Sequence, residues 1–501
     1  MNYQIKYGAI ISYIGILINI IIGLVYTPWM IRCIGKADYG LYTLTMSVIG
    51  FFVFDFGLGQ AVTRFSAKYI AEGKQEKVNQ LLGLTYKLYL FVDFILLLIL
   101  VGVYFFIPQL YKGLTLDELE RFKIVYVIAA SFSVLSFPFI PLNGIVSAYE
   151  LFVQLKSCDL IHKLVIVVLM TGCLLLGFGL YALVIVNAIA GVLMIIIKII
   201  FLKSRTPLDI DWCFWNKGLL REIFGFSVWI TIAALAQRGV LNICPSILGY
   251  ATDSQSIAIF GVAMTLEGYV YTFTNAINGL FLPKVTRLIT DNHQDNLLPL
   301  MVRVGRIQLF LLGLIVLGFV CTGQNFVNAW LGDDFSKVFL CALLMIAPSF
   351  VGQTQNIAST TIVVQNKVRK SARINVIKAV VNLLLAYPLT VLWGVYGMAL
   401  SIFVSYSVSL LQNNLLYHKD LKLNIPLFFK DCFGKMALPL IFTTIICYSI
   451  NIWIDNNGWI HFSTKVLFFC MVYFALMFSF GLNQEEKIIL VSPFKKLLKI
   501  K

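Results

Sequence analysis

Four ionisable residues lie in otherwise apolar stretches of the sequence, where a charge is costly: Asp55, Asp93, Arg238 and Glu267. At the centre of a membrane helix, Arg or Asp costs on the order of 2.5–3.5 kcal/mol on insertion scales, so such a residue usually faces a cavity or a partner. A guanidinium matches the oxygens of a phosphate group, and an intramembrane carboxylate can relay a proton or a cation. The sequence thus predicts anion binding at Arg238 and cation handling at the acids, provided that membrane helices position them.

The composition of the chain predicts such membrane helices. The 501 residues are 59% hydrophobic and 13% charged, with a mean hydropathy of +0.87, whereas about a quarter of the residues in soluble domains are charged. Roughly 20 apolar residues cross a hydrocarbon layer about 30 Å thick. We therefore predict an all-α polytopic membrane protein with about 14 transmembrane helices, at residues 8–31, 41–63, 86–107, 123–146, 161–179, 181–202, 223–249, 257–282, 307–329, 337–365, 374–393, 397–417, 436–454 and 465–482.

The basic residues predict the orientation of these spans. All but eight of the 39 Lys and Arg residues lie in or beside cytoplasmic segments if both termini are cytoplasmic, as the positive-inside rule requires. The net charge of +15 then follows from membrane topology, and nucleic-acid binding is a poor explanation for it. The first span follows a short segment that contains Lys6 and has no cleavage motif, so we expect a retained helix and not a signal peptide.

Cysteine and histidine positions give no sign of a cofactor. Six of the ten cysteines fall within predicted spans and no Cys-x-x-Cys occurs, so we expect them to act as small apolar residues, without structural disulfides. The four histidines are scattered near span ends. No metal and no cofactor is predicted.

A weak internal repeat divides the chain. Gly40 corresponds to Gly261, and Arg64 in Val-Thr-Arg-Phe corresponds to Arg287 in Val-Thr-Arg-Leu, at offsets of 221 and 223 residues. Agreement of offsets at several places argues against chance similarity between apolar segments, which is the alternative. Six helices therefore repeat once in the same sense, as in transporters that move two bundles around a central site. The predicted parts are an N-terminal lobe at 1–205, a C-terminal lobe at 206–420, and two added helices with a basic tail at 421–501.

Several motifs carry a family resemblance: GKADYGLY at 35–42, FDFGLGQAVTRF at 54–65, WLG at 330–332 and QNKVR at 365–369. Together they resemble bacterial polysaccharide-biosynthesis flippases of the multidrug/oligosaccharidyl-lipid/polysaccharide exporter superfamily, over the whole chain. The resemblance implies two six-helix lobes around a V-shaped central cavity. It also implies transfer of an undecaprenyl-pyrophosphate-linked oligosaccharide from the inner to the outer leaflet. Many O-antigen flippases have twelve spans, so the two added helices leave the subfamily open.

With such a substrate, the charged residues have competing roles. Arg238 either binds the pyrophosphate, with Glu267 holding it or carrying a coupling cation, or pairs with Glu267 and pins two helices. Asp55 and Asp93 are either proton or cation sites or hydrogen-bonded structural carboxylates.

Three further basic residues are candidates for substrate binding: Arg64, Arg287 and Lys378. Arg64 and Arg287 either anchor their helices at the cytoplasmic face or attract the anionic head group there. Lys378 lies just inside a predicted span and can extend to the interface.

Five prolines lie inside predicted spans, at positions 138, 141, 348, 388 and 439, and Phe137-Pro138-Phe139-Ile140-Pro141 is the strongest candidate for a broken helix.

A transporter explains the sequence better than an enzyme. No phosphate-cradling Gly-rich loop, nucleophile elbow or metal cluster occurs. We expect a flippase in the bacterial cytoplasmic (inner) membrane that serves lipopolysaccharide O-antigen, capsule or exopolysaccharide assembly, with coupling to protons, sodium or membrane potential left open. Expected partners are the lipid-linked oligosaccharide, the bilayer, and a polysaccharide polymerase and glycosyltransferases. The alternatives are a peptidoglycan lipid-precursor flippase and a cation-coupled drug exporter.

Overall fold

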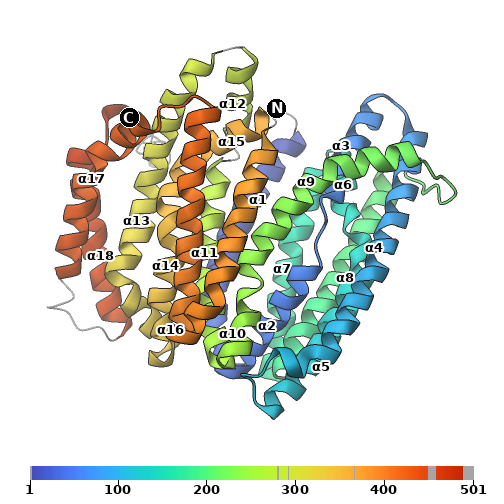
Figure 1. Cartoon of the computed structure of the whole chain (residues 1–501), viewed down its shortest axis with the longest axis horizontal. Helices are drawn as coiled ribbons and strands as arrows, with labels where there is room; N and C mark the ends of the chain where they lie inside the picture. Colours follow the sequence, from blue (N-terminus) through green and yellow to red (C-terminus); the bar gives the residue numbers. More distant parts are fainter. Residues whose placement is uncertain (1–2, 279–280, 292, 366, 450–457, 489–501) are drawn as a thin grey trace. The chain divides into compact units, whose positions relative to one another are not determined.

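The computed structural model describes residues 3–278, 281–291, 293–365, 367–449 and 458–488. Within these ranges every regular element is a helix (Figure 1), which confirms the all-α class. Contacts between Cα atoms divide the chain into two compact units. Unit 1 comprises Met1–Gly261 and Asn375–Met398, and unit 2 comprises Val262–Ile374 and Ala399–Lys501.

Unit 1 contains the first ten α-helices, the beginning of an eleventh and the middle of a later one. The ten, with the 3-10 helix η1, are α1 (Tyr3–Ile34), α2 (Lys36–Phe52), α3 (Leu58–Ala71), α4 (Gln75–Leu110), α5 (Leu116–Ser136), η1 (Phe137–Phe139), α6 (Pro141–Ala148), α7 (Phe152–Leu175), α8 (Leu180–Arg205), α9 (Lys217–Leu241) and α10 (Cys244–Ala251). In addition, α11 (Ser254–Asn278) begins here, and the middle of α16 (Val368–Asp420), residues Asn375–Met398, belongs to this unit.

Unit 2 contains the remaining helices. They are the rest of α11 and α16, with α12 (Leu282–Thr290), η2 (Gln294–Asn296), α13 (Leu297–Leu331), η3 (Asp333–Phe335), α14 (Lys337–Gly352), η4 (Gln353–Gln355), α15 (Asn356–Val364), α17 (Ile425–Ser449), α18 (Trp459–Leu476) and the π-helix η6 (Met477–Gly481). In Figure 1, α17 and α18 lie beside α13, against which both pack.

Twelve helices in the described residues are long and apolar enough to cross a membrane. The number fourteen is thus not confirmed, and the difference arises at two places. The predicted span at 41–63 is interrupted at residues 53–57, between α2 and α3. The predicted spans at 374–393 and 397–417 both fall in α16, where Trp393 and Gly394 have non-helical backbone angles. The end of the predicted span at 436–454 lies outside the described residues.

The predicted helix break at Pro138 and Pro141 is confirmed. Residues Phe137–Phe139 form a 3-10 turn between α5 and α6, because a proline removes a backbone donor and its ring clashes with the preceding turn. A second break, at η4, follows Pro348 in α14.

The order of elements supports the predicted parallel repeat. In the first half, α2 is followed by short α3, and α5 by η1 and short α6; in the second half, α11 is followed by short α12, and α14 by η4 and short α15. In each half the two short helices pack together, α3 on α6 and α12 on α15. Contact clustering nevertheless groups α9 and α10 with the N-terminal helices, so the lobe boundary at 205/206 stays a prediction.

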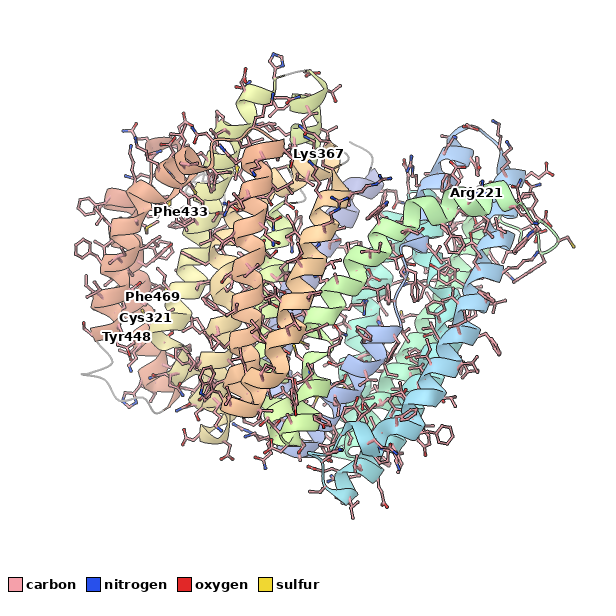
Figure 2. The ribbon with its side chains drawn as sticks, in the orientation of Figure 1. Arg221, Cys321, Lys367, Phe433, Tyr448 and Phe469 are labelled. Atoms are coloured by element: carbon pink, nitrogen blue, oxygen red, sulfur yellow. The ribbon has the colours of Figure 1, made fainter. Side chains whose placement is uncertain are left out.

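Apolar side chains cover both the core and the outside of the bundle. In unit 2 the core includes Cys321 of α13 and Phe469 of α18, which lie close together in Figure 2. On α4, the large apolar residues Phe91, Phe94 and Phe105 are exposed. Apolar surface of this extent is rare on soluble monomers, and it is the face expected to contact lipid.

Candidate functional site in unit 1

The break at residues 53–57, between α2 and α3, is held by polar contacts within unit 1. Phe56 and Gly57 have positive φ angles of 52° and 68°, a region that costs a residue with a Cβ about 1–2 kcal/mol. Asp55 stabilises the start of α3, since its carboxylate accepts from the backbone N–H of Gly59 at 2.9 and 3.1 Å. Tyr89 of α4 donates to the same carboxylate at 2.5 Å. Asp55 is therefore placed as a hydrogen-bonded carboxylate at a helix start.

Helix α9 supplies hydroxyl donors to two carbonyl groups of the break. The Thr231 hydroxyl donates to the Phe56 carbonyl at 2.6 Å, and the Ser227 hydroxyl donates to the Gly57 carbonyl at 3.2 Å. Directly after the last residue of α9, the Asn242 amide donates to the Ser47 carbonyl at 3.4 Å. These residues recur at spacings that place them on one face of a helix. This face of α9 therefore packs along both α2 and the break that follows it.

Arg238 lies on this same face and is half-buried. Its guanidinium donates to the carbonyl of Gly50, in the last turn of α2, and its Cζ lies 5.1 Å from the ring centroid of Phe54. The last four carbonyls of a helix lack intrahelical partners and carry partial negative charge. Arg238 thus neutralises the broken end of α2. Glu267 is buried in the part of α11 that belongs to unit 2, and the predicted pairing with Arg238 stays a prediction.

The middle of α16, residues Asn375–Met398, packs against α9 and α10 in unit 1. The position that a Cβ would take at Gly239 lies 3.8 Å from the Cβ of Ala379. One turn later, the Asn382 amide donates to the Val240 carbonyl at 3.3 Å. Lys378, adjacent to Ala379, is 8% exposed. The structure thus brings Lys378 and Arg238 onto neighbouring helices of one unit.

The remaining predicted residues are dispersed. Arg64 on α3 and Arg287 on α12 are both exposed, at matched positions of the two short helices. Asp93 on α4 is partly buried, and its Oδ1 is buried without a hydrogen-bond partner among the described residues. Asp93 therefore differs from Asp55, whose two oxygens are both engaged.

Two repeat-matched glycines form a close helix crossing at the predicted outer end. A Cβ at Gly40 of α2 would overlap the backbone carbonyl of Ser254 at the start of α11. A Cβ at Gly261 of α11 would lie 2.7 Å from Cγ2 of Thr43 on α2. Small residues let membrane helices approach this closely. We refer to the contact of Gly40 and Gly261 with the facing helix as the glycine crossing.

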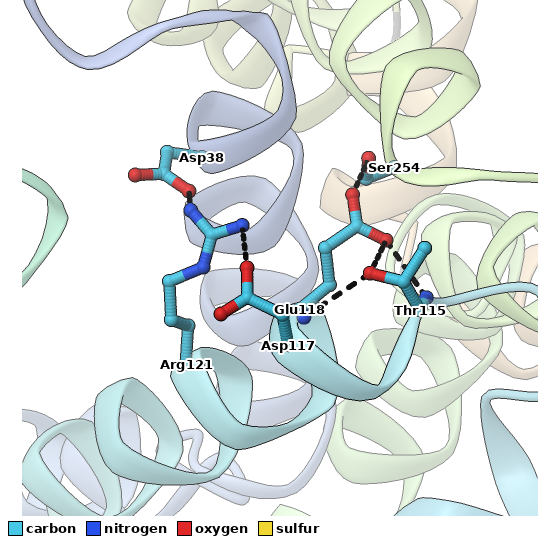
Figure 3. Close-up of polar contacts among 6 residues, drawn as sticks. All are labelled: Asp38, Thr115, Asp117, Glu118, Arg121 and Ser254. Carbon is cyan, nitrogen blue, oxygen red and sulfur yellow. Dashed lines mark hydrogen bonds and ion pairs between the residues drawn. The ribbon is translucent and has the colours of Figure 1, made fainter.

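A polar network adjoins the glycine crossing (Figure 3). Glu118 of α5 accepts from the Ser254 hydroxyl at 2.5 Å and from the backbone N–H of Thr115 at 2.9 Å. Arg121 of the same helix pairs with Asp38 of α2 and, at 2.7 Å, with Asp117. The network therefore ties α2, α5 and the start of α11 together.

Two parts of this arrangement were not predicted from the sequence. The break at residues 53–57 contains no proline, and the only signal was Gly57 inside an apolar stretch. The second part is the start of α5, where Thr115 and Glu118 have the spacing of a capping box, which the structure contains.

Over the described ranges, no group of three or more His, Cys, Asp or Glu residues is placed to hold a metal ion. All ten cysteines are free.

Comparison with known proteins gives the family. Residues 5–289 match the sequence profile of the family described as "Polysaccharide biosynthesis protein". The chain is 22% identical to the "Uncharacterized membrane protein EpsK" of Bacillus subtilis (strain 168), and the alignment covers 99% of each chain.

Solved structures share the fold. The chain superposes on a structure of the Lipid II flippase MurJ in an inward closed conformation with a TM-score of 0.71 and 13% identity, covering 97% of this chain and 99% of that one. A multidrug resistance MATE family transporter in an inward-facing conformation gives a TM-score of 0.65 at 13% identity, covering 84% and 95%. The chain is thus a multi-pass membrane protein that belongs to the polysaccharide biosynthesis protein family and has the fold of these transporters.

Proposed function

We propose that this protein transfers an undecaprenyl-pyrophosphate-linked oligosaccharide repeat unit from the cytoplasmic to the outer leaflet, for assembly of a surface polysaccharide. The sugars and pyrophosphate cross between the lobes by alternating access while the prenyl chain stays in lipid. No chemical bond changes, so the protein acts as a transporter and not as an enzyme. Its site of action is the bacterial inner membrane with both termini cytoplasmic, beside the polymerase and glycosyltransferases of the same assembly.

The observation that carries the proposal is Arg238 at the break at residues 53–57, in a chain of the polysaccharide biosynthesis family. A guanidinium has five N–H donors in a fixed fork, and the contact with Gly50 uses one of its nitrogens. The remaining donors suit the oxygens of a pyrophosphate. Because Arg238 of α9 is hydrogen-bonded to the last turn of α2, its guanidinium can also move with that helix end when the backbone angles of the break change.

A peptidoglycan lipid-precursor flippase is the second candidate, because the MurJ structure covers 97% of this chain, including the two added helices. The multidrug transporter structure covers 84%, so a drug exporter is the weaker alternative. Proteoliposomes that contain the purified protein distinguish these candidates when each is loaded with one lipid-linked substrate. Transfer of the peptidoglycan precursor in preference to an oligosaccharide repeat unit would contradict the first proposal.

The Arg238→Ala variant is expected to reduce flipping by about tenfold or more, since losing a charge-assisted hydrogen bond costs about 1.5–3 kcal/mol. The Arg238→Lys variant keeps the charge and should retain part of the activity. Surface-glycan complementation in a strain that depends on this protein measures both variants.

Asn242→Ala is the matched control for Arg238, because Asn242 caps α9 one turn after Arg238 and also donates to a carbonyl of α2. It should flip at close to the unmodified rate. Full activity of Arg238→Ala, at equal protein abundance, would remove Arg238 from the mechanism.

For ion coupling, Asp93→Asn and Asp55→Asn are expected to separate two roles. Asp93 has a buried oxygen without a partner in the described part of the chain, so its neutralisation should abolish the dependence of flipping on a proton or sodium gradient. Asp55 holds the start of α3, so its variant should lower thermal stability and keep that dependence. Flipping that is insensitive to both gradients and to membrane potential would leave Asp93 with a structural role.

A further inference from the structure

Three lysines gather around one carboxylate where α6, α7 and α8 meet in unit 1. Asp159 of α7 pairs with Lys156 of α7 at 3.4 Å and with Lys198 of α8 at 3.7 Å. Lys198 also donates to the side-chain oxygen of Asn143 of α6 at 2.9 Å. The third lysine, Lys163, lies two turns beyond Lys156 on α7 and forms no ion pair among the described residues of its unit. Positive charge therefore exceeds negative charge in this cluster.

Two of these lysines, Lys163 and Lys198, lie inside the predicted spans at 161–179 and 181–202, near the cytoplasmic end of each. Lys198 is seven residues before Arg205, the last residue of α8, and Lys163 is eleven residues after Phe152, the first residue of α7. At 1.5 Å per residue, these positions are about 10 and 16 Å along the helix axis from the helix ends, which extend beyond the predicted spans. A lysine that only marks the cytoplasmic face can do so at the helix end without desolvation. A cation inside the span carries a cost, so its usual surroundings are a cavity or a counter-charge.

A cavity of about 180 Å³ lies beside this cluster. Its walls are Lys156, Asp159, Leu160 and Lys163 of α7 and Ile11, Ser12, Gly15 and Ile16 of α1. No atom lies within 4 Å of the position that a Cβ would take at Gly15, so the α1 backbone is open to the cavity. At about 30 Å³ per water molecule, the cavity holds roughly six waters. This space suits a phosphate-bearing head.

We infer that this cavity, which we call the lysine cavity, binds the pyrophosphate of the lipid-linked substrate when it enters from the cytoplasmic leaflet. Lysine ammonium groups bind phosphates as point charges, and basic pockets between membrane helices on the cytoplasmic side bind phosphorylated head groups. Lys156 and Lys163 contact the phosphates, and Asp159 and Asn143 hold Lys198 beside them. The inference rests on the proposed substrate class and adds an entry site that is separate from Arg238.

The test is binding of farnesyl pyrophosphate to the full-length protein in nanodiscs, with farnesol as the probe that lacks the phosphates. The triple variant Lys156→Gln/Lys163→Gln/Lys198→Gln should weaken binding of farnesyl pyrophosphate by about tenfold or more, a change of 1.4 kcal/mol. The triple variant Lys68→Gln/Lys74→Gln/Lys77→Gln is the matched control. It removes equal charge from the predicted cytoplasmic face, outside the lysine cavity, and should bind as the unmodified protein does.

Nanodiscs with and without phosphatidylglycerol separate the two sources of a phosphate group. If phosphatidylglycerol abolishes the binding of farnesyl pyrophosphate, the cavity holds a phospholipid head and the inference fails. Equal binding by both triple variants would also overturn it. Flipping in proteoliposomes, measured in parallel, separates this inference from the function. If the triple variant Lys156→Gln/Lys163→Gln/Lys198→Gln binds and flips normally, only the inference of the lysine cavity fails. If the unmodified protein binds farnesyl pyrophosphate but flips no oligosaccharide lipid, only the proposed function fails.

Discussion

Arg306→Ala is expected to destabilise unit 2 by about 3–5 kcal/mol, because it leaves Glu486 charged, buried and unpaired. Arg306 of α13 pairs with Glu486 at 2.5 and 3.0 Å, and the side chains are 3% and 5% exposed. The guanidinium also donates to the carbonyls of Gly481 and Asp431 at 2.8 and 3.2 Å. One arginine thus ties α13 to both added helices. Thermal unfolding in detergent should show a midpoint lowered by on the order of 10 °C.

The neighbouring pair Arg303–Glu485 is the control for this prediction. It spans 3.5 Å, and its side chains are 53% and 78% exposed, so Arg303→Ala should cost less than about 1 kcal/mol. A buried pair can often be replaced by apolar residues without loss, and Arg306→Met/Glu486→Leu should therefore recover much of the lost stability. An Arg306→Ala protein that unfolds at the unmodified temperature would show that the pair does not hold the added helices.

Gly40→Ala is expected to open the glycine crossing, because the new methyl group would overlap the Ser254 carbonyl, a backbone atom that cannot rotate away. Overpacking of this kind costs about 1–3 kcal/mol. The ratio of molecules with the glycine crossing closed to molecules with it open should fall by roughly 5- to 150-fold, since 1.4 kcal/mol is a factor of ten. Disulfide cross-linking of Glu118→Cys to Ser254→Cys, with and without Gly40→Ala, measures this ratio, and flipping should fall with it.

Two other glycines serve as controls for the crossing. A methyl group at Gly102 of α4 meets no atom within 4 Å, so Gly102→Ala should leave cross-linking unchanged. At Gly261 the obstacle is the Thr43 side chain, so Thr43→Ala should restore the cross-linking that Gly261→Ala loses. If Gly40→Ala cross-links and flips normally, the glycine crossing is not part of the outer closure.

These experiments bear on the proposed transport cycle at different points. The Arg306 variant tests the attachment of the added helices, and the Gly40 variant tests closure of the predicted outer end. The Arg238 variants test the contact with the end of α2 beside the break. Only variants at Arg238 and the lysine cavity are expected to change how strongly the pyrophosphate binds. A set of variants in which stability, closure and binding change separately would support alternating access.

The sequence by itself determined the class of the protein, the approximate positions of its helices and their internal repeat. Runs of about 20 apolar residues can satisfy their backbone hydrogen bonds in lipid only as helices. These features therefore depend on local sequence and can be predicted from it. The break at Pro138 and Pro141 was predictable for the same reason, since proline acts within its own turn. The repeat also marked Gly40 and Gly261, although nothing in the sequence showed that each faces the helix that carries the other.

Only the tertiary structure decided which polar residues meet. Arg238 and Gly50 are 188 positions apart, and Arg306 and Glu486 are 180 apart, so no periodicity links them. In an apolar chain the few charges carry large desolvation costs, and each cost is offset by whichever carbonyl or counter-charge the packing brings near. Packing therefore turned Asp55 into a helix-start acceptor and Arg238 into a donor at a broken helix. It also placed three lysines from two helices around Asp159, an arrangement that was not predicted from the sequence.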